Sequence, residues 1–247
     1  MKVYLSRWTC LDPDSNLLRM EEEARDAAAL GSEIVVFPEL ALTGYTREIE
    51  PARCRDACAR VSSAEPGVLY VFGSICEDRY NRMIVYSKGN ELVHYDKVHL
   101  FRPNREHERW HRGDRYVAFR WRGHTIGLVN CNDIRFPEQA RALKLEARCD
   151  LLVVPAWWPW RRDHIWSVLL QARAAENQLW VAGCCIAGSV EEVEFAGAGN
   201  HVFDPSGEPV RTADDRTYEL DFGNPPPSVV DPVERYVEID RVEVISG

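Results

Sequence analysis

The stretch TIGLVNCNDIRFPEQARALKLEARCDLLVVP, residues 125–155, carries the pattern that decides the fold. An apolar run leads up to Cys131, a helix is predicted from about Pro137 to Arg148, and a second apolar run, DLLVVP, follows. Two short apolar runs joined by one helix are typical of a β-α-β unit, whose strands are buried and whose helix covers the sheet. The chain therefore ends a buried strand on a thiol and follows it at once with polar side chains, the first of them Asn132.

The N-terminal third has a similar design. It is predicted to contain a strand from Lys2 to Trp8, a helix from about Ser15 to Leu30, and a strand EIVVF (33–37) that stops at Pro38. Asp14 or Ser15 can cap this helix at its N-terminus, and Gly31 can end it. The pattern predicts another β-α-β unit.

Alternating apolar runs predict the remaining strands. They lie in residues 68–77, in residues 80–97 with a turn at Lys88-Gly89-Asn90, in residues 116–131 with a turn at Arg122-Gly123, and in residues 179–186 after a helix from about His164 to Gln178. Two halves of mixed sheet plus helices predict an α/β fold, a four-layer α-β-β-α sandwich of two mixed sheets. Since no linker divides the chain, residues 1–247 are expected to form one domain. Residues 213–247 are expected to be a C-terminal tail that wraps the surface or contacts a partner subunit.

Composition excludes several classes of partner. The net charge is −9, whereas a nucleic-acid groove needs clustered Lys and Arg. The sequence has neither a run of about 18 apolar residues nor a secretory leader, so we expect no membrane contact and a cytoplasmic location. The eight cysteines are irregularly spaced in a chain with a large core, and we expect reduced thiols.

Two pairs of potential metal ligands, Cys54 with Cys58 and His107 with His111, have the spacing of one helix face. Neither pair has a matching second pair at the spacing of a structural zinc site. The segment CRDAC is amphipathic, so its cysteines are expected to pack in the core. We expect no metal and no cofactor.

Three potential catalytic side chains follow predicted strands: Glu39, Lys97 and Cys131. Functional groups of α/β proteins collect where strands end and loops begin. A carboxylate can take the thiol proton, and an ammonium can face a developing oxyanion. That ammonium, together with a helix N-terminus beyond the cysteine, would favour the thiolate. Each residue alone also has a structural interpretation, as a core thiol, a carboxylate bonded to backbone amides, or a surface lysine.

The stretches VVFPELALTGY, YDKVHLF and NCNDIRFPEQAR resemble, in order and spacing, the three catalytic motifs of the nitrilase superfamily, the carbon-nitrogen hydrolases. ARAAENQLWVAG (172–183) and NHVFDPSGEPV (200–210) resemble its later signature stretches. The resemblance implies the four-layer sandwich, cofactor-free hydrolysis of a non-peptide C–N bond, and homodimers or larger homo-oligomers. It also implies that Glu39 is the general base, Lys97 the oxyanion stabiliser and Cys131 the nucleophile, with the backbone N–H of Asn132 as the second oxyanion donor.

Many members of that family have a second glutamate seven residues before a glycine in the loop after the lysine. The segment EHERWHRG has Glu106 at that distance from Gly113, and Glu108 is the competing choice. By resemblance, Glu106 would orient the lysine or the substrate nitrogen.

The residues after Cys131 reduce the number of reactions that the sequence is compatible with. Nitrilases proper usually have Trp-Glu after the cysteine, and this chain has Asn132-Asp133. The Cys-Asn-Asp order resembles N-carbamoyl-D-amino-acid hydrolases, but of their arginine pair only Arg135 matches, because Ile134 replaces the first. Asp133 and Arg135 could instead brace the turn. We favour a hydrolase of small amides, similar to ω-amidases, that releases ammonia. An N-carbamoyl amino acid hydrolase is the alternative, followed by a nitrilase or an inactive scaffold.

The segment PAWWPWRRDHIW (155–166) follows a predicted strand, where the family builds a pocket wall. Trp157, Trp158 or Trp160 could line an apolar site, and Arg161 or Arg162 could bind a substrate carboxylate. Alternatively, the tryptophans pack under the loop or at a subunit contact.

Overall fold

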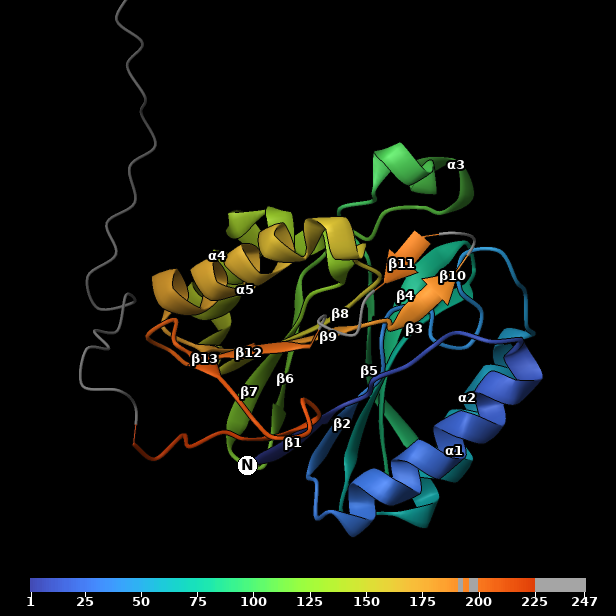
Figure 1. Ribbon diagram of the computed structural model, residues 1–247, viewed down its shortest axis with the longest axis horizontal. Coiled ribbons are helices and arrows are strands. Elements are labelled where there is room, and N and C mark those ends of the chain that lie inside the picture. The colour runs from blue at the N-terminus through green and yellow to red at the C-terminus, as the bar shows by residue number, and fades with distance from the viewer. Residues whose placement is uncertain (191–192, 196–199, 225–247) are drawn as a thin grey trace, which may run out of the picture.

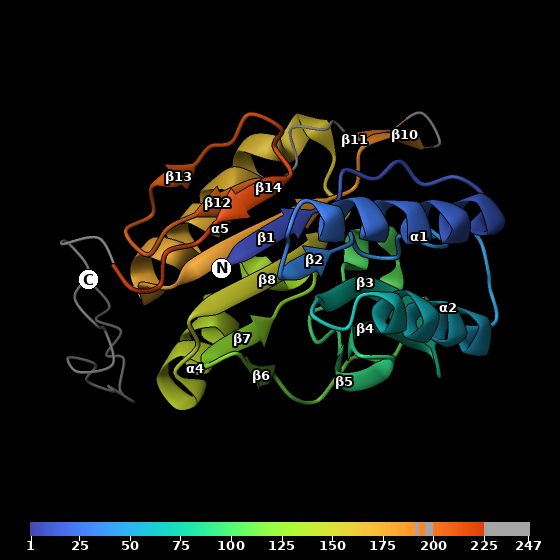
Figure 2. The same ribbon diagram turned by 90° about the horizontal axis from the view of Figure 1, so that it is seen from below.

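The computed structural model describes residues 1–190, 193–195 and 200–224, and these residues form two sheets packed face to face with helices outside (Figure 1 and Figure 2). The first sheet has the order β14 (Thr217–Glu219), β1 (Lys2–Leu5), β2 (Ile34–Val36), β3 (Leu69–Glu77), β4 (Tyr80–Ser87) and β5 (Asn90–Asp96). The second has the order β13 (Pro209–Val210), β12 (His201–Phe203), β9 (Trp180–Cys185), β8 (Leu151–Ala156), β7 (His124–Leu128) and β6 (Val117–Trp121). Helices α1 (Pro13–Ala29) and α2 (Pro51–Ala64) cover the first sheet, and α4 (Pro137–Ala147) and α5 (Asp163–Asn177) cover the second (Figure 1). The predicted four-layer α-β-β-α sandwich is confirmed.

The centre of each sheet is parallel and its edges are antiparallel. Strands β1, β2 and β3 pair in parallel, as do β7, β8 and β9, and the hairpin strands β5 and β6 lie at the edges. Both β-α-β units predicted from the sequence are therefore present. A small hairpin of β10 (Gly188–Val190) and β11 (Val193–Phe195) lies beyond the end of β9.

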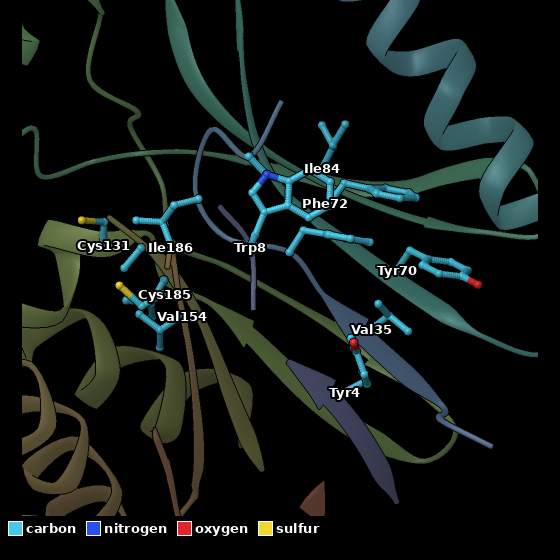
Figure 3. Packing of buried hydrophobic residues seen from close by; sticks show 14 of the residues in the cluster. Tyr4, Trp8, Val35, Tyr70, Phe72, Ile84, Cys131, Val154, Cys185 and Ile186 are labelled. Atoms are coloured by element: carbon cyan, nitrogen blue, oxygen red, sulfur yellow. The ribbon is translucent and has the colours of Figure 1, made fainter. Parts of the chain in front are cut away.

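Strand alternation divides the core in two. One set of side chains fills the space between the sheets, with Val3, Ile34 and Val71 from the first sheet and Leu128 and Val153 from the second. Their neighbours in the strands point to the opposite faces, under the helices. Figure 3 shows this second set extending from Tyr4 and Tyr70 past Trp8 and Phe72 to Ile186 and Cys131. Burial of each large apolar side chain contributes about 1.5–3 kcal/mol, and Cys131 lies at one margin of this packed region.

Two predicted element boundaries were wrong. Strand β1 ends at Leu5 rather than Trp8, whose ring is buried against Phe37. Helix α1 begins at Pro13, so the cap is Asp12 rather than Asp14 or Ser15, and its carboxylate accepts the Ser15 N–H at 3.0 Å. Proline suits the first helical position, because the N–H that it lacks would have no partner there.

The two predicted hairpin turns are confirmed. Lys88 and Gly89 have φ angles of 52° and 77°, and Arg122 and Gly123 have φ angles of 46° and 84°. Left-handed conformations at both central positions match the twist of the flanking strands, and glycine adopts them without strain.

The predicted C-terminal tail is only partly described. Its first part includes β14, which pairs antiparallel with β1 at the edge of the first sheet. Residues 225–247 lie outside the described residues, so the contact with a partner subunit stays a prediction. Among the described helices, none is long and apolar enough to cross a membrane.

Candidate active site

The strand ends bring the predicted catalytic side chains together. Glu39 follows β2, Lys97 comes directly after β5, Glu106 begins the short helix α3 (Glu106–Arg109), and Cys131 begins the 3-10 helix η2 (Cys131–Arg135) after β7. Glu39, Lys97 and Glu106 each have 0% of their surface exposed. Charged groups so fully buried must be paired or neutralised, because water no longer solvates them.

The Lys97 ammonium bridges the two carboxylates. Its Nζ lies 2.7 Å from Oε1 of Glu39 and 3.1 Å from Oε1 of Glu106. Burial alone would lower the pKa of Lys97, but the two carboxylates outweigh it and hold the pKa well above its usual value. Lys97 therefore stays positively charged where an oxyanion donor is needed.

Glu39 is held by several further donors. Asn81 Nδ2 donates to Oε1 at 2.8 Å, while the Tyr45 hydroxyl and the Trp157 backbone N–H donate to Oε2 at 3.0 Å and 3.3 Å. Donors on both oxygens fix the orientation of the carboxylate. Asn81 and Tyr45 were not predicted from the sequence. The available signals were that Tyr45 is the last residue of VVFPELALTGY and that Asn81 is a polar residue inside the strand predicted in residues 80–97.

Cys131 is held in an unusual backbone conformation. Its φ is 51°, in the left-handed region that residues other than glycine seldom adopt. The following turn is fixed by Asp133, whose buried carboxylate accepts the Tyr95 hydroxyl at 2.7 Å and the backbone N–H groups of His99 and Asn130 at 2.8 Å and 2.9 Å. As predicted, Asp133 braces the turn.

The Cys131 thiol is protonated at rest, contrary to the expectation that its surroundings favour the thiolate. Burial, and then the charge of Glu39, raise the pKa of Cys131 well above its usual value, and Lys97 opposes them only in part. The thiol lies 3.8 Å from the carbonyl oxygen of Trp157, whose N–H donates to Glu39. Nucleophilic attack from such a thiol needs a base to take its proton, and Glu39 is held next to the same backbone segment.

A cavity of about 380 Å³ opens above Cys131. Its lining is aromatic and basic, and no acidic side chain of the described residues lines it. The lining includes Tyr45, Arg47, Phe101, Cys131, Asn132, Arg135, Trp157, Trp158, Arg162 and Phe195.

Two arginines of this cavity face aromatic rings instead of acids. The Arg135 guanidinium lies 4.6 Å from the Trp158 ring centroid, and that of Arg162 lies 5.6 Å from Phe101. Burial, and then the positive charge of Arg162, lower the pKa of Arg135. Neither arginine has a carboxylate partner among the described residues, so the cavity offers an anion two free guanidinium groups.

The other predicted binding residues divide into two groups. Asn132, Trp157 and Trp158 line the cavity, as does Arg162. Arg161 is exposed and Trp160 is 45% exposed, and neither lines it. Of the two alternatives, Arg161 and Arg162, the structure places only Arg162 against the cavity, because the turn of η3 (Trp160–Arg162) points successive side chains in different directions, which sequence spacing could not resolve.

The two candidate glutamates differ in burial and in their partners. Glu106 is buried against Lys97, and the backbone N–H of Phe101 donates to its Oε2 at 2.7 Å. Glu108 is exposed and pairs with Arg105 at 2.6 Å. The seven-residue spacing before Gly113 therefore identifies the residue that contacts the lysine.

The possible metal pairs lie apart from this site. Cys54 and Cys58 are buried on one face of α2. His111 lies beyond the end of α3, so the pair with His107 does not share a helix face. Among the described residues, no group of three or more His, Cys, Asp or Glu side chains could hold a metal ion.

The family match and the similar proteins of known name or structure agree with one another. Residues 4–223 match the family described as carbon-nitrogen hydrolase. The chain is 31% identical to the omega-amidase YafV of Escherichia coli K12, over 83% of this chain and 80% of that protein. It is 32% identical to the 2-oxoglutaramate amidase of Bacillus subtilis, over 81% of this chain and 84% of that protein.

A solved structure of an amidase variant from Nesterenkonia sp. AN1 is also similar, with a TM-score of 0.75 and 25% identity over 84% of this chain and 83% of that one. In that protein the acetamide moiety of fluoroacetamide is covalently added at the active-site cysteine.

Proposed function

The chain belongs to the carbon-nitrogen hydrolase family and is an amidase-type hydrolase, and from this premise we propose that it cleaves the terminal amide of a short carboxylic acid monoamide and releases ammonia. The observation that carries the proposal is the buried ion pair of Glu39 and Lys97 beside the protonated thiol of Cys131. The thiol lies at the base of a cavity in which two arginines have no acidic partner among the described residues.

The chemistry follows from the charges of the site. Glu39 takes the Cys131 proton as the sulfur attacks the amide carbon, and the oxyanion is stabilised by Lys97 and the backbone N–H of Asn132. Glu39 then gives the proton to the nitrogen, ammonia leaves, and a thioester remains. A water molecule passes a proton to Glu39 while it attacks the thioester carbon. The thiolate leaves, regains that proton, and the acid is released.

Glu106 acts through Lys97 and not on the substrate carbon. Its bond to the ammonium at 3.1 Å and its own anchor on the Phe101 N–H hold Lys97 in place. A positioned donor costs less reorganisation when the oxyanion forms.

The substrate class follows from the cavity walls. Aromatic side chains suit a short aliphatic chain, and Arg135 and Arg162 suit a carboxylate at its far end. The names of two relatives, omega-amidase and 2-oxoglutaramate amidase, support the same class. We therefore propose an ω-amide of a short dicarboxylic acid as the substrate.

The test is ammonia release from a panel of ω-amides of dicarboxylic acids, neutral aliphatic amides of matched length, N-carbamoyl amino acids and nitriles. Cys131→Ala should abolish turnover. Arg162→Ala should raise KM at least about tenfold for the carboxylate-bearing amides, as expected for a lost charge-assisted contact, and leave neutral amides unchanged.

Arg161→Ala is the matched control, because Arg161 is the exposed neighbour outside the cavity. Equal effects of the two arginine variants would contradict the carboxylate assignment. Turnover confined to N-carbamoyl substrates would replace the proposal by its alternative, and turnover that survives Cys131→Ala would refute the mechanism.

We also propose that the protein forms a homodimer or a larger homo-oligomer, and that it works in a reducing compartment such as the cytoplasm. On the outer layer above the second sheet, Val168 of α5 is 59% exposed and Trp160 is 45% exposed. A contact with a second copy would remove such exposed apolar side chains from water. All eight cysteines, each of them a described residue, are free thiols, which supports a reducing environment.

A further inference from the structure

We propose that Glu106 carries a proton which the Tyr45 hydroxyl shares with Glu39, and that this proton frees the charge of Lys97 for the oxyanion. The inference rests on the proposed amide hydrolysis and assigns Tyr45 a positioning role in it.

The Tyr45 hydroxyl contacts both carboxyl groups. Tyr45 Oη lies 3.0 Å from Oε2 of Glu39 and 3.0 Å from Oε1 of Glu106. A hydroxyl has one proton and can donate to only one carboxylate. The second short contact is attractive only if that carboxyl carries a proton and donates it to Oη.

The cluster of Glu39, Lys97 and Glu106 would carry a net charge if both carboxyl groups were ionised. Two carboxylates and one ammonium, all fully buried, sum to −1 beside a neutral thiol. One additional proton makes the cluster neutral, which removes the cost of an unpaired buried charge.

The number of donors decides which carboxyl is protonated. Glu39 accepts hydrogen bonds from Lys97, Asn81 and the Trp157 N–H, besides the Tyr45 hydroxyl. Besides the Tyr45 hydroxyl, Glu106 has two donors among the described residues, Lys97 at the longer distance of 3.1 Å and the Phe101 N–H. Burial raises the pKa of Glu106, Lys97 opposes this, and the charge of Glu39 raises it further, so that the pKa stays above its usual value. The proton belongs on Glu106, in the order Glu106 O–H to Tyr45 Oη, and Tyr45 O–H to Glu39.

The consequence concerns the oxyanion. With Glu106 protonated, Glu39 and Lys97 balance each other at rest. When Glu39 takes the thiol proton, Lys97 balances the new oxyanion alone. With Glu106 ionised, one ammonium would have to balance two negative charges. The proton can also move from Glu106 to Tyr45 as the Tyr45 proton moves to Glu39, which breaks two O–H bonds and forms two.

The groups that face this hydroxyl are Glu39 in the loop after β2, Lys97 after β5, Glu106 of α3 and Cys131 of η2. Arg109 of α3 donates to the backbone carbonyl of Tyr45. The ring packs against Trp110 and Trp157, with centroids 5.8 Å and 5.5 Å away. A phenylalanine at this position would keep these ring contacts and lose only the hydroxyl.

The direct test is infrared difference spectroscopy of the protein at neutral pH without substrate. We expect the carbonyl band of a protonated buried carboxyl, and we expect Glu106→Gln to remove it. Glu108→Gln is the control, since that carboxylate is exposed on the same helix. Absence of the band, or its survival in Glu106→Gln, would overturn the inference. Because this readout needs no turnover, it is independent of the proposed substrate.

The second test is the pH dependence of kcat/KM in Tyr45→Phe. Glu106 loses the acceptor of its proton, so the basic limb of the profile should move to lower pH by about one unit. KM should change little, and Tyr80→Phe, at a tyrosine outside the cluster, should match the wild type. A uniform loss of activity with unmoved limbs would show that Tyr45 is only structural.

Discussion

Lys97 controls the charge balance at the scale of single residues. Its ammonium contacts both buried carboxyl groups, and its bonds to Glu39 and Glu106 are 2.7 Å and 3.1 Å long. A buried ionic cluster as a whole contributes little to the free energy of unfolding. Removal of one of its members destabilises the fold much more, because the remaining charges stay buried without a partner.

Lys97→Met should therefore lose about 3–5 kcal/mol in free energy of unfolding at neutral pH and about 10²–10³-fold in kcat. Without the ammonium, the folded cluster can be neutral only if a second proton joins the one on Glu106, whereas the unfolded chain releases both protons at neutral pH. The stability of the variant therefore falls as the pH rises, and its deficit should shrink as the pH falls. Denaturant unfolding across the acid to neutral range measures this.

Lys144→Met, at a half-buried lysine of α4, is the control for removal of an amine elsewhere. A deficit of Lys97→Met that does not vary with pH would contradict the charge argument.

Glu39, Lys97 and Cys131 could be proposed from the sequence because each follows a predicted strand, in a motif that resembles those of the nitrilase superfamily. Tyr45 and Asn81 escaped because their role depends on hydrogen bonds to Glu39, from 6 and 42 residues away along the chain. The protonated state of Cys131 escaped as well, since burial outweighs the nearby ammonium and only the folded structure gives the burial.

At the scale of elements, a bulge in β3 shapes the strand end that carries Glu39. The register between β3 and β4 shifts between Val71 and Ser74, and Gly73 within this bulge has a φ of 63°. A Cβ at Gly73 would come 1.8 Å from the carbonyl oxygen of Pro38, the residue before the base. The bulge thus lets β3 pass directly behind the Pro38–Glu39 peptide.

Gly73→Ala should displace this peptide, and we expect at least about a tenfold loss of kcat and a lower Tm, in line with a backbone clash at a left-handed residue. Gly123→Ala is the matched control, because Gly123 also has a positive φ and no atom of the described residues lies within 4 Å of the added Cβ. Similar activity of the two variants would show that the close approach does not matter. Thermal unfolding and ammonia release measure the two effects.

Elements were predictable where glycine fixed a turn, as at Gly89 and Gly123, and where apolar runs fixed buried strands. The start of α1 was displaced by two residues because Asp12, Asp14 and Ser15 are all competent caps, and only the position of Pro13 in the folded helix distinguishes them. The bulge at Gly73 has no comparable local signal, since it depends on Pro38 in a neighbouring segment.

At the scale of the whole molecule, the two sheets assemble one site from both halves of the sandwich. Glu39 and Lys97 follow strands of the first sheet and Cys131 and Trp157 follow strands of the second, so packing of the sheets positions base and nucleophile. The sandwich was predictable from the paired β-α-β pattern. The faces available for association were not, because exposure depends on the final arrangement of α4 and α5.

We predict a homodimer or larger oligomer in which α5 contributes to the contact. Light scattering should give a mass of at least about twice 28.3 kDa, and Val168→Lys should lower it, because the side chain is 59% exposed in one copy. Arg141→Lys on α4 is a control that keeps the surface charge. A monomer at micromolar concentration would contradict this prediction.

The central claim is that the reaction passes through a thioester on Cys131. The most direct measurement is rapid acid quench of the enzyme during turnover of its best ω-amide, followed by peptide mass spectrometry. We predict a mass increase equal to the acyl group on the Cys131 peptide, absent when the enzyme is Cys131→Ala and absent after turnover is complete. Steady turnover with no acyl group on Cys131 at any quench time, together with activity retained in Cys131→Ala, would contradict it.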